Sequence, residues 1–174
     1  PELSSPRFET SPDGKHLLVK DVAGGGDLID LDTKKVQTVS HELLNLQYSA
    51  DGKTILGNRK DATISFYTDK EMLQAGRVLR LKGQFWLMKL SPDGKKIATT
   101  NENGAVQVWD AQTGALLKTT PGRFGLVNSL SFSPDGSKIL AGYNEHVAKF
   151  IELGSQEADE VTTQFLSEAD KEKS

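Results

Sequence analysis

The stretch SPDGKKIATTNENGAVQVWDAQTG, residues 91–114, holds two strand-like segments, each introduced by a tight turn. Its first turn, Ser-Pro-Asp-Gly, is a repeated element of the chain. The same turn begins at Ser11, Ser49 and Ser133, with Ala50 replacing proline in one copy, at a spacing of about 40 residues. Proline presets φ, aspartate bonds to the local backbone, and glycine accepts a positive φ. The chain is therefore predicted to consist of four copies of one unit.

The segments around these turns predict four strands per unit. First strands are predicted before the last three turns, at residues 43–48, 85–90 and 126–132. Second strands follow the turns at 16–19, 54–57, 96–100 and 138–142, and third strands lie at 27–31, 63–67, 105–109 and 147–151. Fourth strands are predicted at 35–39, 77–81, 115–119 and 160–165. Such short, regularly spaced strands indicate an all-β propeller, sandwich or barrel, and a period of about 40 residues favours the propeller.

With these features the chain resembles the WD40-repeat β-propeller family, most closely at residues 91–114. Trp109-Asp110 stands where the Trp-Asp pair of that family closes the third strand. The same count from the turn glycine places Tyr67 and Ile151 in the tryptophan position of two other units. In the first unit, the glycine-rich stretch 23–27 predicts a shift of this position to Leu31-Asp32.

The resemblance also implies a buried polar network that this chain does not keep in full. The family often carries an Asp six residues before the Trp, linked to a His, a Ser and the Trp. Asn103, Asp61 and Glu145 occupy that position here, and His41 lies one residue out of register. We therefore expect the sheets to depend more on apolar packing than on this network.

The resemblance implies four four-stranded blades within residues 1–166, at about 6–40, 41–82, 83–124 and 125–166, followed by an acidic flexible tail, 167–174. The inward positions of the first strands are predicted core residues: Phe8, Leu43, Leu46, Tyr48, Phe85, Met88, Leu90, Val127, Leu130 and Phe132. Rings of this family usually have about seven blades. The chain is then part of a larger ring of seven or eight blades, a half-ring completed by a second copy or another chain, or a closed four-bladed ring. The first two arrangements are favoured, because an open half-ring exposes apolar blade faces.

Composition limits the kinds of partner and compartment. The 174 residues carry a formal net charge of −3 and no cysteine, which excludes a disulfide framework, a thiolate nucleophile and a cysteine zinc site. The near-neutral body and acidic tail give no electrostatic footprint for nucleic acid. No stretch has the pattern of a signal peptide or a membrane span, so no membrane association and a cytoplasmic location are expected.

Residues that could carry chemistry are few. His16, His41 and His146 do not share a metal-ligand spacing. The acidic run Asp27, Asp30 and Asp32 is either a calcium site or a solvated strand edge, and the second interpretation is favoured because the spacing of a calcium loop is missing. No Gly-x-Ser-x-Gly elbow occurs. The sequence thus predicts no catalytic residue, no metal and no cofactor.

The expected function is a non-catalytic protein–protein interaction scaffold that binds through loops gathered at one rim. The candidate partner-binding residues in these loops are Arg59, Lys60, Gln84, Trp86, Asn103, Arg123, Phe124 and Asn144. Trp and Arg are favoured because both anchor protein interfaces. The alternative is part of a propeller enzyme, such as a metal-dependent hydrolase or lactonase, or of a sensor, whose active residues lie elsewhere.

Overall fold

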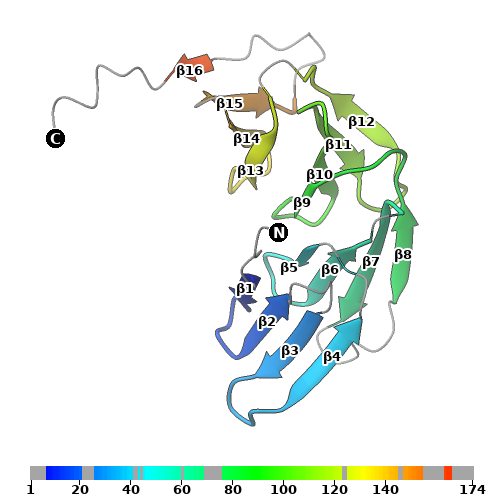
Figure 1. Cartoon of the computed structure of the whole chain (residues 1–174), viewed down its shortest axis with the longest axis vertical. Coiled ribbons are helices and arrows are strands. Elements are labelled where there is room, and N and C mark those ends of the chain that lie inside the picture. The colour runs from blue at the N-terminus through cyan, green and yellow to red at the C-terminus, as the bar shows by residue number, and fades with distance from the viewer. Residues whose placement is uncertain are drawn as a thin grey trace, which may run out of the picture. The chain divides into compact units, whose positions relative to one another are not determined.

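The computed structural model describes residues 7–20, 26–40, 43, 45–59, 61–68, 76–122, 125–144, 147–154 and 163–165. Within these residues the chain forms sixteen β-strands and no helix (Figure 1). The strands form four sheets, each of four antiparallel strands in simple sequence order. This all-β arrangement of four-stranded sheets confirms the predicted fold class.

The first two sheets occupy the N-terminal part of the chain. The first contains β1 (Arg7–Thr10), β2 (His16–Lys20), β3 (Gly26–Asp30) and β4 (Val36–Ser40). The second contains β5 (Asn45–Tyr48), β6 (Thr54–Asn58), β7 (Thr63–Thr68) and β8 (Arg77–Arg80).

The other two sheets repeat this order. The third contains β9 (Leu87–Leu90), β10 (Lys96–Thr100), β11 (Val106–Asp110) and β12 (Leu116–Thr119). The fourth contains β13 (Val127–Phe132), β14 (Lys138–Tyr143), β15 (Val147–Glu152) and β16 (Thr163–Phe165). The strands expected from the sequence are therefore confirmed to within two residues at each end, apart from residues 160–162 of the last predicted strand, which lie outside the described residues.

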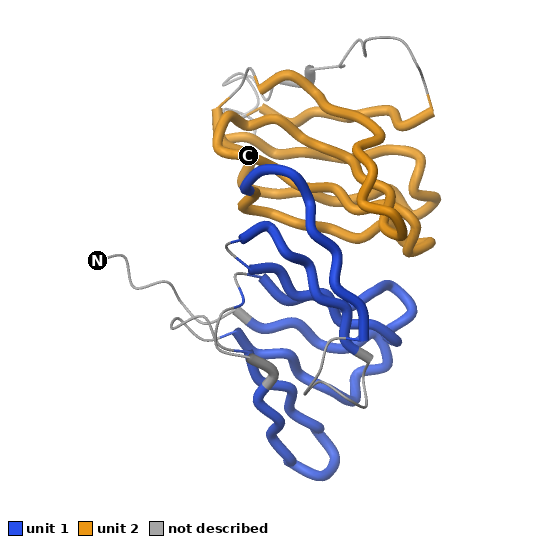
Figure 2. Tube along the Cα trace, turned by 90° about the vertical axis from the view of Figure 1, so that its right-hand side faces the viewer, with its two compact units in different colours: residues 1–84 blue, residues 85–174 orange. Residues whose placement is uncertain are grey.

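The chain divides into two compact units, residues 1–84 and 85–174, and each unit contains two sheets (Figure 2). The core of the first unit lies between its sheets and joins Leu18, Leu28, Leu43, Tyr48, Ile55 and Tyr67, with Leu46 packed against them. The core of the second unit joins Ala98, Val106, Val108, Val127, Leu130, Ile139, Ala141, Tyr143, Val147 and Ile151. Within each unit, stacking of the two sheets thus buries the apolar residues of the facing strands.

The Ser-x-Asp-Gly turns have one geometry in all four sheets. Each serine hydroxyl donates to the aspartate two residues on, at 2.5–2.6 Å, and accepts the backbone N–H of the residue that begins the second strand, at 2.9–3.0 Å. The turn glycines all have positive φ, between 68° and 72°. The turn built on Ala50 has the same bonds, so the Ser, Asp and Gly positions suffice without proline.

Most of the predicted core residues are confirmed. Leu43, Tyr48, Phe85, Met88, Val127 and Leu130 are buried, and Leu46, Leu90 and Phe132 are partly buried. The prediction for Phe8 is wrong, because its side chain is 73% exposed. Phe8 pairs with Val19 on the face of β1–β4 that points away from the core of the first unit.

The predicted tryptophan position is correct in three units and wrong in the first. Trp109, Tyr67 and Ile151 are all buried. In the first sheet, however, Ile29 lies opposite Leu17, as Trp109 lies opposite Ile97, so Ile29-Asp30 and not Leu31-Asp32 corresponds to Trp109-Asp110. The predicted shift fails because Gly26 is not part of an insertion: it belongs to β3, and an added Cβ would meet the Leu46 side chain.

Candidate functional site

The candidate rim of the second unit is formed by strand ends that antiparallel pairing brings together. Thr100 at the end of β10 lies opposite both Leu87 and Val106, so the segment before β9 and the β10–β11 turn share one end of the sheet. The Trp86 N–H donates to the Thr100 carbonyl at 2.8 Å and fixes the chain there. This end of the second unit carries Trp86 and Asn103.

Close backbone contacts hold the neighbouring loops of this end together. A Cβ on Gly104 would lie 1.9 Å from the Gly125 carbonyl oxygen, and a Cβ on Gly122 would lie 1.8 Å from the Asn103 carbonyl oxygen. The β10–β11 turn therefore touches the connection from β12 to β13. Within the turn, the Asn101 side-chain oxygen accepts the N–H groups of Asn103 and Ala105 at 3.1 and 3.0 Å. These bonds fix the backbone of the β10–β11 turn.

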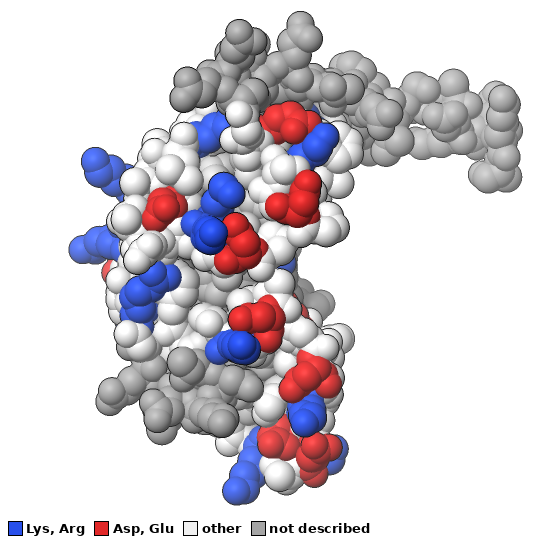
Figure 3. All heavy atoms as spheres, turned by 180° about the vertical axis from the view of Figure 1, so that it is seen from behind, with Lys and Arg blue, Asp and Glu red and all other residues white. Residues whose placement is uncertain are grey.

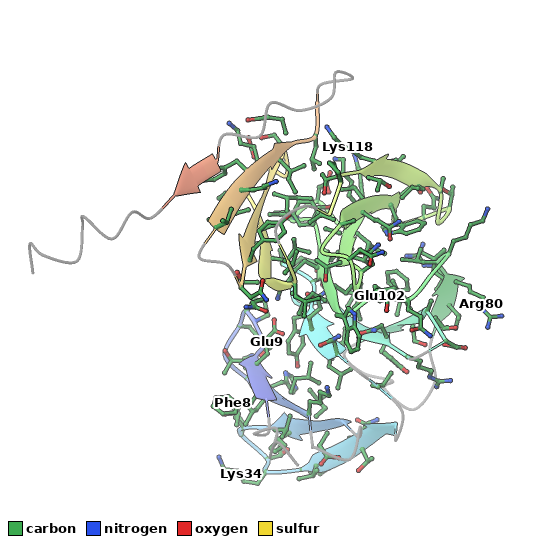
Figure 4. All side chains as sticks on the ribbon, turned by 45° about the horizontal axis from the view of Figure 1, so that its top comes forward. Phe8, Glu9, Lys34, Arg80, Glu102 and Lys118 are labelled. Atoms are coloured by element: carbon green, nitrogen blue, oxygen red, sulfur yellow. The ribbon has the colours of Figure 1, made fainter. Side chains whose placement is uncertain are left out.

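Trp86, Asn103 and Asn144 are exposed on this surface. The Trp86 side chain is 63% exposed, although it directly precedes β9, in which Met88 is buried. Glu102 projects from the same turn as Asn103 (Figure 4). Asn144 directly follows β14, and its N–H donates to the Leu126 carbonyl at 3.0 Å, beside the start of β13. The structure thus brings three of the predicted residues to one end of the second unit.

In the first unit, the corresponding loop is charged. Asp61 forms an ion pair with Arg80, whose Nη2 lies 3.7 Å from Asp61 Oδ2 and whose side chain extends into solvent (Figure 4). Hydrogen bonds from Thr63, together with Arg80 and Arg59, lower the pKa of the Asp61 carboxyl below its usual value. Arg59 is half-buried at the end of β6, and Gln84 is exposed at the end of the unit. Lys60, Arg123 and Phe124 lie outside the described residues, as do His41, Glu145 and the proposed tail.

Sequence reasoning missed two buried polar side chains of the second sheet, Gln47 on β5 and Asn58 on β6. Asn58 is fully buried, and neither its amide nitrogen nor its amide oxygen has a hydrogen-bond partner among the described residues. Gln47 Nε2 and Arg59 Nε are likewise buried and unpaired there. The alternating pattern of β5 and β6 could have placed Gln47 and Asn58 on one face, but it gives no signal that the side chains are buried.

One link of the polar network expected from the family resemblance is present. The Trp109 indole N–H donates to the Thr99 hydroxyl at 2.8 Å, and both side chains are buried. Sequence counting had noted the Asp position and overlooked Thr99, which stands on the neighbouring strand β10. This bond satisfies the one polar group of an otherwise apolar side chain.

The acidic run on β3 caps a turn. The Asp30 carboxylate accepts the N–H groups of Asp32 and Thr33 at 3.0 and 2.7 Å, and Asp27 accepts the Thr38 hydroxyl at 2.7 Å. No group of three or more His, Asp and Glu residues is placed to hold a metal ion in the part of the chain that the structure describes.

Among the described residues, no helix has the length and apolar character to cross a membrane. Acidic and basic side chains are intermixed on the face shown in Figure 3.

Comparison with known proteins identifies the repeats. A sequence model of the family described as WD domain, G-beta repeat matches residues 77–110 and 114–150. These two segments match the WD40 repeat. Each begins at the fourth strand of one sheet, β8 or β12, and ends on the third strand of the next, β11 or β15. The WD40-repeat family predicted for this chain is therefore supported, and its four-stranded sheets are consistent with WD40 blades of a partial propeller.

Similar curated proteins include a WD repeat-containing protein and subunits of a translation initiation factor. The chain is 26% identical over 137 residues to an uncharacterised WD repeat-containing protein of Synechocystis, a match that covers 76% of this chain and 39% of that protein. It is also similar to eukaryotic translation initiation factor 3 subunit I of Emericella nidulans, with 26% identity over 62% of this chain and 32% of that protein. For the subunit I of Neurospora crassa the identity is 28% over 56% of this chain and 28% of that protein. The chain thus spans about a third of the length of these relatives.

Proposed function

We propose that this WD40-repeat chain is a non-catalytic protein-interaction scaffold that binds protein partners through the loops at the strand ends. The WD40 repeats and the similarity to initiation factor subunits support a role in protein interaction generally. The proposed binding residues are Arg59, Lys60, Gln84, Trp86, Asn103, Arg123, Phe124 and Asn144. A cytoplasmic location is part of the same proposal.

The observation that carries this proposal is the exposed Trp86 side chain on a fixed backbone. Its own N–H is bonded to β10, so the indole is held at the rim without the entropy loss of ordering a free loop. Tryptophan combines a large apolar area with one hydrogen-bond donor, which makes it a frequent anchor of protein interfaces. Asn103 and Asn144 at the same end add directed hydrogen bonds around that anchor.

The relatives' names are the second support. Two of them are named as subunits of an initiation factor, and a subunit acts through contacts with other chains. Because this chain spans only about a third of those proteins, no specific partner is carried over. Neither the repeats nor these names point to an enzyme, and no observation among the described residues favours the hydrolase or sensor alternative.

A phage-displayed random peptide library selected on the chain tests the proposal. Peptides that bind the rim should bind Trp86→Ala at least about tenfold more weakly than the unchanged chain. Leu117→Ala is the matched control, because Leu117 is also a large exposed apolar residue but lies within β12. Equal binding to the unchanged chain and Trp86→Ala, or no enriched peptide at all, contradicts the proposal.

A further inference from the structure

The fourth strands of the sheets, β4, β8, β12 and β16, are end strands, each with a neighbour on one side only among the described residues. The pairing of β8 with β7 runs without a shift from Arg77 to Arg80. The pairings of β4 and β12 each contain a register shift, and β16 has only three residues. Because a bulge or a short strand blunts a sheet edge, β8 is the fourth strand best able to accept another strand.

The backbone groups that β8 directs out of the sheet belong to Val78 and Arg80. The Leu81 N–H donates to the Ala62 carbonyl at 3.1 Å, so Leu81 is a hydrogen-bonded position of the β7–β8 ladder. Bonded and non-bonded positions alternate along an antiparallel pair, which makes Leu79 the next bonded position. The N–H and C=O groups of Val78 and Arg80 therefore point away from β7, toward the free edge.

The side chains of β8 repeat one pattern on both faces of the strand. Because side chains alternate along a strand, Arg77 and Leu79 share one face, and Val78 and Arg80 share the other. Each face thus offers one guanidinium and one apolar group, and Val78 is 57% exposed. An extended segment with the order acidic, apolar, apolar, acidic would place a carboxylate opposite each arginine and an apolar side chain opposite each apolar residue.

Both arginines are held in positions from which they can bind a carboxylate. The Arg77 guanidinium lies over the Phe66 ring, with Cζ 3.9 Å from the ring centroid, and this stacking orders the side chain. Arg80 Nη2 lies 3.7 Å from Asp61 Oδ2, and the two side chains are 73% and 52% exposed. Such an exposed ion pair contributes little to stability, so a carboxylate of a partner can replace Asp61 at low cost.

The charge around β8 favours an acidic partner. Residues 54–82 contain six Lys and Arg and three Asp and Glu residues, a net charge of +3, whereas the whole chain has −3. Basic residues on an edge strand hinder apolar strands and identical copies from pairing with it. The same residues attract an acidic strand, so these charges both reject unsuitable strands and select a complementary one.

We propose that the free edge of β8 binds an extended acidic segment of a partner protein, which adds a fifth strand to the second sheet. Every residue of this site lies within the first compact unit and in the interior of the sequence. The backbone edge of β8 is a different surface from the end of the second unit that carries Trp86. Binding at this edge therefore stands or falls independently of the proposed binding at the strand-end loops.

Fluorescence anisotropy of a labelled, end-capped peptide, Thr-Glu-Val-Val-Glu-Thr, added to the whole chain tests this site. The order of its residues is the same in both directions, so it fits a parallel or an antiparallel strand. The peptide should bind, and Thr-Lys-Val-Val-Lys-Thr should bind at least about tenfold more weakly. A copy of the acidic peptide with N-methylated central residues keeps its charges but loses N–H donors, and it should also bind at least about tenfold more weakly.

Exchanging the charges of β8 is the sharper test. The double variant Arg77→Glu/Arg80→Glu should bind the acidic peptide at least about tenfold more weakly and should prefer the lysine peptide, a gain that an unfolded chain would not show. The control Lys53→Glu/Lys95→Glu makes the same charge change at two exposed turn lysines, and it should bind like the unchanged chain. Trp86→Ala should also bind the acidic peptide normally.

Three results would overturn the proposal. The first is no binding of the acidic peptide, including the case in which an oligonucleotide of similar charge binds instead. The second is equal binding of the acidic peptide and its N-methylated copy, which would mean that charge alone attracts it. The third is unchanged binding of the acidic peptide to the Arg77→Glu/Arg80→Glu variant, which would place the peptide away from β8.

Discussion

The β1–β4 and β9–β12 sheets share their turn, their strand order and their register, yet they differ in what surrounds them. In both, the same Ser-Pro-Asp-Gly turn joins the first and second strands, and a third-strand residue lies opposite the third residue after the turn glycine. That residue is the buried Trp109 in one sheet and the half-buried Ile29 in the other. Local sequence thus builds the same sheet twice, and the packing of the faces makes the difference.

The largest expected effect comes from truncating the two equivalent residues. Trp109→Ala removes a buried ring and its bond to Thr99, which should lower the free energy of unfolding by about 3–5 kcal/mol. Ile29→Ala removes a half-buried side chain and should cost about 1 kcal/mol. Urea unfolding of both variants at the same protein concentration measures these two losses. The concentration is held constant because any self-association of the chain would add to its apparent stability. Equal losses would mean that the two positions are equally covered in solution.

A smaller effect should come from the turn after the third strand. Lys34 has a φ of +61°, where the third sheet has Gly114 at +75°. A lysine in this region is strained, so Lys34→Gly should stabilise the chain by about 0.5–1 kcal/mol, and Gly114→Lys should destabilise it by a similar amount. Lys35→Gly, next to the strained residue but without a positive φ, is the control and should not stabilise. Stabilisation by the control variant instead would contradict the strain argument.

These sheets also mark how far the sequence could be interpreted. The turns, the strands and the buried Trp109, Tyr67 and Ile151 follow from local patterns, because Gly, Asp and alternating apolar residues act within a few positions. Phe8 was misassigned because its burial depends on which sheet lies next to β1, and no local pattern encodes that. The position of Ile29 was misassigned because Gly26 looks like part of a loop, although it makes room for Leu46 inside the sheet.

The candidate site was predictable to a similar extent. The strand-end loops that carry Trp86, Asn103 and Asn144 follow from the repeat. The contact between the Gly104 and Gly125 loops and the burial of Asn58 depend on tertiary packing. Counting along the chain cannot detect such contacts, since they join residues from different strands and sheets.

The smallest effect separates the fourth turn from the others. Serine hydroxyls lower the pKa of Asp13 and Asp93, and backbone N–H groups of Lys15 and Lys95 add to this. At Asp135 the Ser137 hydroxyl adds a further bond, at 2.8 Å, and the pKa falls to about 2. A lowered pKa in the folded chain means that the stabilisation is complete above the ordinary value of 3.8 and is lost as pH falls toward about 2.

Carboxyl titration by NMR and urea unfolding across that pH range measure this effect. Ser137→Ala should raise the pKa of Asp135 toward those of Asp13 and Asp93 and make the stability of the chain less dependent on pH. Ser131→Ala, an exposed serine on β13, is the control and should leave the Asp135 pKa unchanged. An Asp135 pKa that does not move in Ser137→Ala would show that the Ser133 and backbone bonds alone set its value.

Hydroxyl-radical footprinting of the two tryptophans tests most directly whether the strand-end loops bind a partner. The account predicts that the exposed Trp86 is reactive in the free chain and becomes protected when a rim-binding peptide is added, while the buried Trp109 stays protected throughout. Reactivity of Trp86 that does not change when the peptide binds would contradict the proposed role of the rim.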